Sequence, residues 1–299
     1  MDQASALREI KGNGAISRSK MVASSVIEKR ERPLPQHRVR VVAVASGKGG
    51  VGKTNISANL AYLLAKMKKK VLVLDADVGL ANIDVILGLT PKYNLYHVLK
   101  GEKSLRDIIV PGPGGFMILP SASGIQEMSD LSRGAKLTLL DEIKTLREEL
   151  DFMLIDTGAG IASNVMYFNM AAQEIIVVTT PEPTAMTDAY ALIKVLYQRH
   201  AKERFRILVN MVKNEEEAKE VYARLNQATN HFLNVSVEYM GYVSRDENIS
   251  EAVRKQKPFV SLYPHSPASK CLHLLAEKIS REAPERDLSG TLGFFWDVV

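Results

Sequence analysis

The sequence is poor in cysteine and in long apolar runs. Cys271 is the single cysteine among 299 residues, which excludes an intramolecular disulfide and any all-cysteine metal site within one chain. No apolar stretch approaches the roughly 20 residues that a membrane-spanning helix needs, and the N-terminus has no apolar core of the signal-peptide type. We therefore expect a cytoplasmic protein in which Cys271 is a small buried residue near the last helix.

Most of the chain also lacks an excess of charge of either sign. The net charge is +5, and residues 1–40 hold nine Lys or Arg and four Asp or Glu, which is the same +5. Residues 41–299 are therefore neutral overall. The basic residues belong to an arm rather than to the fold, which argues against a nucleic-acid-binding domain, although a neutral domain could still carry a local basic patch.

Short apolar runs alternate with helical patterns from residue 39 onward. Each run predicts a buried strand: VRVVAVAS (39–46), VLVLD (71–75), FMILP (116–120), FMLID (152–156), EIIVVTT (174–180), RILVN (206–210) and YMGYV (239–243). Continuous apolar strands between helices predict an α/β domain, with a mostly parallel central sheet and helices on both faces. The helical pattern SKCLHLLAEKI (269–279) closes this domain.

Four segments are expected along the chain. They are a short helix-prone peptide (1–10), a flexible basic linker rich in Gly, Ser and Pro (11–38), the α/β domain (39–280) and an amphipathic C-terminal tail (281–299). At 100° per residue, one face of the tail collects Leu288, Leu292, Phe295, Trp296 and Val299. This face could insert into a membrane interface or fold into an apolar groove of its own domain.

The strongest motif is GKGGVGKT (47–54), which matches the P-loop pattern G-x-x-x-x-G-K-[ST] and lies between a predicted buried strand and an amphipathic helix. Its glycines let backbone amides close around a polyphosphate at the positive end of the helix. We expect Lys53 to reach the β- and γ-phosphates of ATP or ADP, and the Thr54 hydroxyl to ligate Mg²⁺. The predicted nucleotide contacts are Gly47, Lys48, Gly49, Gly50, Val51, Gly52, Lys53, Thr54 and Asn55.

Three aspartates follow predicted strands. In LDADVGLANID, Asp75 ends the second strand and Asp77 comes two residues later, and in LIDTGAG Asp156 ends another strand. A strand-terminal carboxylate can reach Mg²⁺ or its waters, which we expect of Asp156 and, near the magnesium shell, of Asp75. A single aspartate of this kind is often a helix cap, but three around a P-loop favour a catalytic site.

The base can also be predicted. The guanine motif N-K-x-D is absent, which argues against a GTPase. Asn210 ends the strand RILVN, where its side-chain amide offers adenine both a donor and an acceptor.

The stretch KGGVGKT resembles the deviant Walker A motif of the MinD/ParA class of P-loop ATPases, and the resemblance extends over about residues 39–280. It implies that Lys48 reaches the nucleotide of the partner subunit in an ATP-dependent homodimer, that Asp77 orients the attacking water, and that Asn210 contacts adenine. Ser244 stands where many relatives carry proline, which leaves the second half of the base pocket open. The single cysteine argues against the iron–sulfur members of the class.

Two stretches, LDADVGLANIDVILGLTP (74–91) and PEPTAMTDAYALIK (181–194), are similar to the MinD-like ATPases that control flagellar number and placement. In the second stretch, the resemblance implies that Glu182 and Asp188 lie near the dimer interface and regulator surface. Alternatively, Thr184 or Thr187 is a plain helix N-cap.

The stretch DQASALR (2–8) is similar to the DQAxxLR motif with which these flagellar ATPases stimulate FlhF, a GTPase of the signal-recognition-particle type. The implied contacts are Asp2, Gln3, Ala4, Leu7 and Arg8. Further implied partners are the flagellar C-ring switch proteins, a flagellar transcription regulator in some bacteria, and the inner face of the cell membrane. An alternative for residues 1–10 is a frayed terminus that simply caps the domain. Alternatives for the whole chain are a ParA-like DNA-binding scaffold or a septum-placing MinD; direct DNA binding is not expected.

Overall fold

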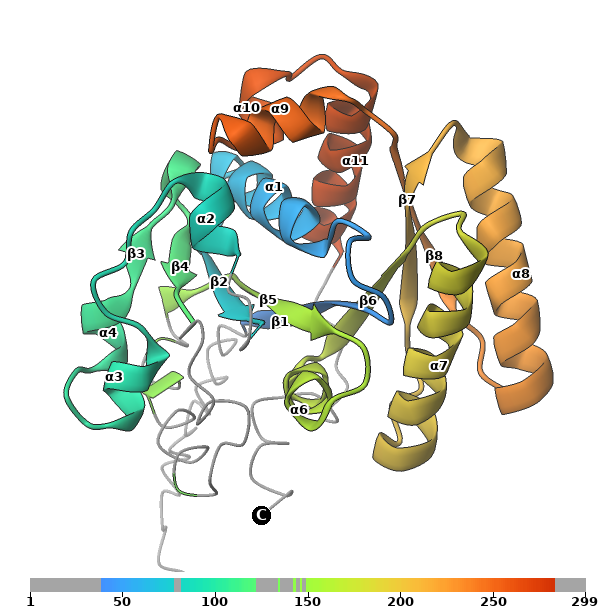
Figure 1. Ribbon diagram of the computed structural model, residues 1–299, viewed down its shortest axis with the longest axis horizontal. Helices are drawn as coiled ribbons and strands as arrows, with labels where there is room; N and C mark the ends of the chain where they lie inside the picture. The colour runs from blue at the N-terminus through green and yellow to red at the C-terminus, as the bar shows by residue number, and fades with distance from the viewer. Residues whose placement is uncertain are drawn as a thin grey trace, which may run out of the picture. The chain divides into compact units, whose positions relative to one another are not determined.

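In the computed structural model, one sheet of eight strands has the order β3-β4-β2-β5-β1-β6-β7-β8 (Figure 1). The structure describes residues 39–77, 82–121, 134, 142, 143, 146 and 149–282. The strands are β1 (Arg40–Ser46), β2 (Val71–Ala76), β3 (Val110–Pro111), β4 (Met117–Leu119), β5 (Phe152–Ala159), β6 (Glu174–Thr179), β7 (Arg206–Val212) and β8 (Glu238–Ser244). Every pairing is parallel except β3 with β4, so the predicted mostly parallel sheet is confirmed.

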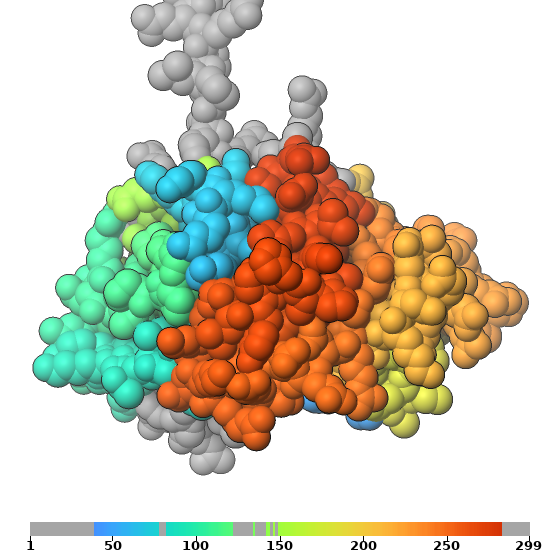
Figure 2. Space-filling view, turned by 90° about the horizontal axis from the view of Figure 1, so that it is seen from above, coloured from blue at the N-terminus to red at the C-terminus, as the bar shows by residue number. Residues whose placement is uncertain are grey.

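Helices cover both faces of the sheet. One face carries α1 (Lys53–Lys66), α2 (Ile83–Leu87), α9 (Asn248–Arg254), α10 (Phe259–Leu262) and α11 (Pro267–Arg281). The other carries α3 (Leu95–Leu99), α4 (Leu105–Ile108), α6 (Ser163–Ala171), α7 (Pro183–His200) and α8 (Glu215–Leu233). A short 3-10 turn, η1 (Pro113–Gly115), joins β3 to β4. Figure 2 shows α1 and the α9–α11 segment together on the first face.

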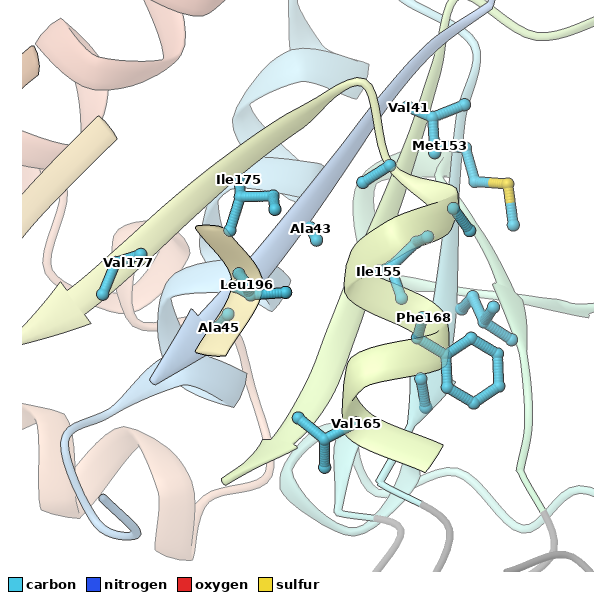
Figure 3. Packing of buried hydrophobic residues seen from close by; sticks show 14 of the residues in the cluster. Val41, Ala43, Ala45, Met153, Ile155, Val165, Phe168, Ile175, Val177 and Leu196 are labelled. Carbon is cyan, nitrogen blue, oxygen red and sulfur yellow. The ribbon is translucent and has the colours of Figure 1, made fainter. Parts of the chain in front are cut away.

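Alternation along the central strands divides the core into two layers. Val41, Ala43 and Ala45 of β1 join one buried cluster, whereas Val42 and Val44 join the other. Figure 3 shows the first layer, in which side chains of β1, β5 and β6 face those of α6 and α7. Because each strand is apolar on both sides, it reads in the sequence as a continuous apolar run.

The predicted boundaries are close to the observed ones. The last helix, predicted over 269–279, extends over Pro267–Arg281, because the Ser266 hydroxyl caps it by accepting a hydrogen bond from Ser269 N–H at 3.1 Å. The helix α11 therefore ends one residue beyond 280, and the predicted division of the chain into four segments stays a prediction. Cys271 lies on this helix and is buried, as predicted. The two-residue edge strand β3 was not predicted, because it is too short to show a pattern.

The four adjacent strands β1, β6, β7 and β8 begin at a cluster of charged residues. We call it the N-edge cluster; its members are Arg40, Glu174, Arg206, Glu238 and Glu282. Arg40 pairs with Glu174 and, at 3.1 Å, with Glu282. Arg206 lies 2.8 Å from Glu282 and 3.1 Å from Glu238. The first residue of each strand is thus held by an ion pair to a neighbouring element.

Arg40 also holds the end of α11. Its Nη1 donates to the carbonyl oxygen of Ile279, and to that of Glu282 at 3.2 Å. The last carbonyls of a helix have no partner inside the helix, and a cation there complements the helix dipole. The N-edge cluster therefore joins the terminal helix to the start of the central strand.

Within the described part of the chain, no helix combines the length and the hydropathy that crossing a bilayer requires. The predicted FlhF contacts in residues 1–10, the linker at 11–38 and the apolar face of the tail lie outside the described residues.

Candidate functional site

The P-loop connects β1 to α1 at the carboxyl edge of the sheet. Gly50 and Gly52 have φ of +78° and +91°, in the left-handed region that favours glycine. A Cβ atom on Gly47 would lie 2.0 Å from the backbone oxygen of Asp188, so this glycine lets α7 approach the loop. Gly52 is the N-cap of α1 and offers no side-chain hydrogen bond to its first turn. These features suit a phosphate cradle at a helix N-terminus.

Lys53 is buried beneath this loop. Its Nζ donates to the Ser46 hydroxyl at 2.7 Å, and that hydroxyl donates to the carbonyl oxygen of Lys48 at 2.7 Å. Burial lowers the pKa of Lys53, an effect opposed by the charges of Asp156 and Asp77. Lys53 is thus a desolvated cation whose hydrogen-bond partner is a neutral hydroxyl, so it can still bind an anion. The sequence reading missed Ser46, a polar residue at the end of an apolar strand.

The run FMLID predicts that Asp156 ends its strand, but β5 continues to Ala159, so Asp156 lies within the strand; it is 2% exposed. Its Oδ1 accepts a hydrogen bond from Ser57 at 3.0 Å, and Thr54 also donates to its carboxylate. Burial raises the pKa of Asp156 to about 6, although these hydroxyls and the charge of Lys53 lower it. Thr54 and Asp156 therefore meet on one side of the P-loop. The sequence reading missed Ser57, which lies one helical turn after Thr54.

Asp75 has a different environment. Its carboxylate accepts hydrogen bonds from the backbone N–H of Asp77 and Asn82, both at 3.1 Å, and from that of Ile83 at 3.2 Å. It therefore caps the start of α2. Helix capping is the alternative role that the sequence allows for an aspartate at a strand end. Burial and the neighbouring charge of Asp156, its partner across β2 and β5, raise the pKa of Asp75 to about 7. A role of Asp75 in the magnesium shell stays a prediction.

Asp77 lies beside the end of β5. A Cβ atom on Gly158 would be 3.3 Å from Asp77 Oδ1, so the carboxylate packs against this backbone. The described residues contain no group of three or more His, Cys, Asp or Glu side chains that could hold a metal by themselves. Mg²⁺ commonly takes one or two carboxylates together with substrate phosphates. The hydroxyl of Thr54 and the carboxylate of Asp156 fit that kind of site.

A cavity of about 280 Å³ lies beside the P-loop and is lined by Gly52 and Asn210. The side-chain amide of Asn210 donates to the carbonyl oxygen of Val51 at 2.8 Å, and its oxygen accepts from Met211 N–H at 2.9 Å. One amide N–H and one lone pair remain for a base. Besides Asn210, the lining residues are Gly52, Asn55, Ile56, Asn59, Met211, Val243, Ser244, Arg245, Asp246, Glu247, Ile249, Ser250, Phe259 and Leu272.

This cavity extends the predicted base site. Asn55, Asn210 and Ser244 line it, and their contact with a base stays a prediction. Its other walls come from α9, α10 and α11, which are distant in the sequence. Asn59 joins α1 to the wall formed by α10, because its side-chain nitrogen donates to Asn55 O at 2.7 Å and its side-chain oxygen accepts from Val260 N–H at 3.0 Å. No periodic or motif signal identified these residues.

Lys48 lies on the outer side of the P-loop, and its side chain is 37% exposed. Its Nζ is 2.7 Å from a carboxylate oxygen of Glu182 and 2.9 Å from the hydroxyl of Thr184. Glu182 and the backbone of Asp188 are therefore both beside the P-loop. Whether they form a dimer or regulator surface stays a prediction.

The alternative role of two threonines as the α7 cap is wrong. The N-cap of α7 is Glu182, and it makes no side-chain cap hydrogen bond. Thr184 is instead a partner of Lys48, and the Thr187 hydroxyl donates to the carbonyl oxygen of Pro183 at 3.0 Å. Pro183 starts the helix with its φ already fixed and needs no cap for its missing N–H.

Comparison with known proteins agrees with this geometry. Residues 38–280 match a family model described as "ParA: NUBPL iron-transfer P-loop NTPase". The chain is 44% identical over 259 residues to the antiactivator FleN of Pseudomonas aeruginosa, covering 87% of this chain and 92% of that protein. It is 37% identical over 261 residues to the flagellum site-determining protein YlxH of Helicobacter pylori, covering 86% and 88%.

Solved structures show the same fold. The MinC:MinD cell division complex of Aquifex aeolicus matches with a TM-score of 0.68 and 28% identity, covering 83% of this chain and 98% of that one. MinD of Pyrococcus horikoshii OT3 in complex with Mg-ADP also has a TM-score of 0.68 and 28% identity, covering 81% and 96%. These matches confirm the predicted fold and the resemblance to MinD-like and flagellar ATPases.

Proposed function

The chain belongs to the ParA/MinD family of P-loop ATPases and hydrolyses ATP with Mg²⁺, and from this premise we propose that it is an ATP-driven switch that regulates flagellar number and placement. The flagellar part of the proposal is supported by the similarity to FleN, also called FlhG, and to YlxH. The observation that carries the switch is the presence of two P-loop lysines with opposite surroundings. Lys53 is buried under the loop, whereas Lys48 is on its surface.

The proposed chemistry is a phosphoryl transfer to water. Water forms a bond to the γ-phosphorus, the bond from that phosphorus to the bridging oxygen breaks, and ADP and phosphate leave. Lys53 binds the terminal phosphates, and Asp77 orients the attacking water. Thr54 and Asp156 would hold Mg²⁺, which would supply positive charge to the phosphates.

Lys48 gives this reaction its dependence on a second subunit. Its contacts to Glu182 and Thr184 keep the ammonium group at the surface, where a partner chain can reach it. In the proposed ATP-bound homodimer, Lys48 leaves these partners and neutralises charge on the nucleotide of the other subunit. ATP hydrolysis then limits the lifetime of the dimer.

The two ends of the chain are the proposed outputs of the switch. Residues 1–10 stimulate the FlhF GTPase, and the apolar face of the tail binds the inner face of the membrane when a dimer presents two tails. The flagellar C-ring switch proteins and a transcription regulator are further proposed partners. These roles rest on the DQASALR motif, the amphipathic tail pattern and the flagellar relatives.

The switch is tested with Asp77→Ala. We expect this variant to bind ATP normally and to remain a dimer in saturating ATP, because the nucleotide cannot be cleaved. Light scattering measures the mass, and a monomer under these conditions contradicts the proposal. Lys48→Ala is the companion variant, which is expected to bind ATP but to release phosphate slowly at all protein concentrations.

The FlhF output is tested by a pull-down with FlhF. We compare the intact chain with one that lacks residues 1–10, and we follow GTP hydrolysis in the same samples. Retained stimulation without residues 1–10 contradicts the assigned role of this peptide. Phosphate release from ATP by both chains serves as the control for the ATPase domain.

A further inference from the structure

The end of β7 contains a backbone irregularity beside the base cavity. The pairing of β7 with β8 shifts register between Asn210 and Val212, so Met211 is an extra residue in the strand. Its φ is +60°, in the left-handed region that side chains other than glycine rarely adopt. Such bulges redirect a side chain and are common next to active sites.

Contacts of the neighbouring residues maintain this conformation. The side-chain oxygen of Asn210 accepts from Met211 N–H at 2.9 Å, and the Asn210 amide donates to Val51 O at 2.8 Å. On the other side, Arg245 N–H donates to Val212 O at 2.8 Å. The amide predicted to recognise adenine therefore also fixes the direction of the Met211 side chain.

The Met211 side chain lies at the rim of the cavity. It is 43% exposed, and its Cε is 3.8 Å from the position that a Cβ atom on Gly52 would occupy. Part of the cavity wall is apolar, since Ile56, Val243 and Phe259 are among the lining residues. An exposed apolar side chain on a strained backbone adds nothing evident to folding, and backbone strain of this kind concentrates at ligand sites.

We propose that Met211 is a base-binding residue of the nucleotide site, whose thioether packs on the face of the adenine ring while Asn210 contacts the edge of the base. This inference rests on the proposed function of the cavity as the base end of the ATP site. A flexible, polarisable thioether makes favourable contacts with aromatic rings. Met211 shields the base from water on the side where the cavity opens.

The test compares ATP with inorganic tripolyphosphate, which has the phosphates but no base. In Met211→Gly, glycine adopts the left-handed φ of this position without strain, and the thioether is removed. Isothermal titration with Mg²⁺ present is expected to show about tenfold weaker ATP binding and unchanged tripolyphosphate binding. Met211→Leu retains an apolar side chain, and its ATP affinity is expected to lie between those of the wild type and Met211→Gly. Leu274→Ala, which shortens an exposed apolar side chain on α11, is the matched control and should change neither affinity.

The outcomes separate this inference from the proposed function. If Met211→Gly binds ATP as tightly as the wild type, the contact with the base is disproved while the ATP site stands. If ATP and tripolyphosphate weaken equally, Met211 acts through the P-loop and the base contact is again disproved. If the wild type binds neither ligand, the ATP site itself is wrong, and the inference fails with it.

Discussion

Strands β1, β6, β7 and β8 can be compared at their two ends. At their start, Arg40 and Arg206 are buried and each pairs with glutamates. At the other edge, Lys53 is buried to a similar degree but donates to the Ser46 hydroxyl. Burial lowers the pKa of all three cations; the charge and hydrogen bonds of glutamates reverse this for the two arginines, whereas Lys53 keeps a lowered pKa.

This difference distinguishes structural charge from functional charge. A buried cation with a carboxylate partner is already neutralised, and removing either member of the pair leaves the charge of the other member without its partner. A buried cation with only hydroxyl contacts still has unsatisfied electrostatic demand, which a phosphate can meet. The same four strands thus have a closed edge that holds the fold and an open edge that holds the ligand.

The largest expected effect is at the N-edge cluster. Glu174→Ala removes the main carboxylate partner of Arg40 and leaves Glu282 as the remaining carboxylate beside this buried guanidinium, which should lower the free energy of unfolding by up to about 3–5 kcal/mol. Urea unfolding followed by circular dichroism measures it. The double variant Arg40→Met with Glu174→Leu should recover much of the loss. If the single variant is as stable as the wild type, the cluster is not structural.

The next effect concerns the packing of the P-loop against α7. Gly47→Ala places a methyl group where the backbone oxygen of Asp188 lies, and it should lower the free energy of unfolding by about 1–3 kcal/mol, as overpacking does. Gly49→Ala is the matched control on stability, because no atom lies within 4 Å of its Cβ position and its φ is not in the left-handed region. Equal stability of the two variants, measured without nucleotide, contradicts the close approach.

The carboxyl edge should also give a pH dependence. The folded-state pKa values of Asp156 and Asp75, about 6 and about 7, lie above the ordinary value of 3.8, so the folded state binds protons more tightly than the unfolded state. The stability that they contribute is therefore present at low pH and is lost as pH rises from about 4 to 7. Asp156→Asn should reduce this slope, by on the order of 1 kcal/mol over the interval. Thermal unfolding between pH 4 and pH 8 measures it, and an unchanged slope contradicts the assignment.

The smallest expected change in stability is at the surface of the same edge. Glu182→Gln removes the ion pair of Lys48, and because both side chains are exposed the free energy of unfolding should change by less than about 1 kcal/mol. Dimerisation in ATP should occur at several-fold lower protein concentration, since Lys48 no longer has to leave a charged partner to reach the other subunit. Glu215→Gln, which breaks a similarly exposed pair with Lys219, is the control and should leave dimerisation unchanged.

Several parts of the fold and site were predictable because local patterns determine them. The buried strands appear as apolar runs, since helices cover both of their faces, and the P-loop is a contiguous motif whose glycines and lysine act together. The placement of Asp156 on a buried strand follows from the run FMLID, although β5 continues past it to Ala159. Other features depend on residues far apart in the chain. Arg40 and Glu282 are separated by 242 positions, and nothing local marks them as partners.

Local patterns in the sequence are enough to specify the type of fold, the phosphate-binding loop and the lysines and aspartates around it. These follow from the period of apolar residues and from backbone chemistry within a few positions. The contacts of each polar group, in contrast, are set by the three-dimensional packing. It made Asp75 a cap of α2, brought the Ser46 hydroxyl to Lys53, and directed Met211 to the rim of the cavity that Asn210 lines. The physical reason is that burial and charge pairing depend on neighbours in space, which a parallel sheet assembles from strands separated by whole helices.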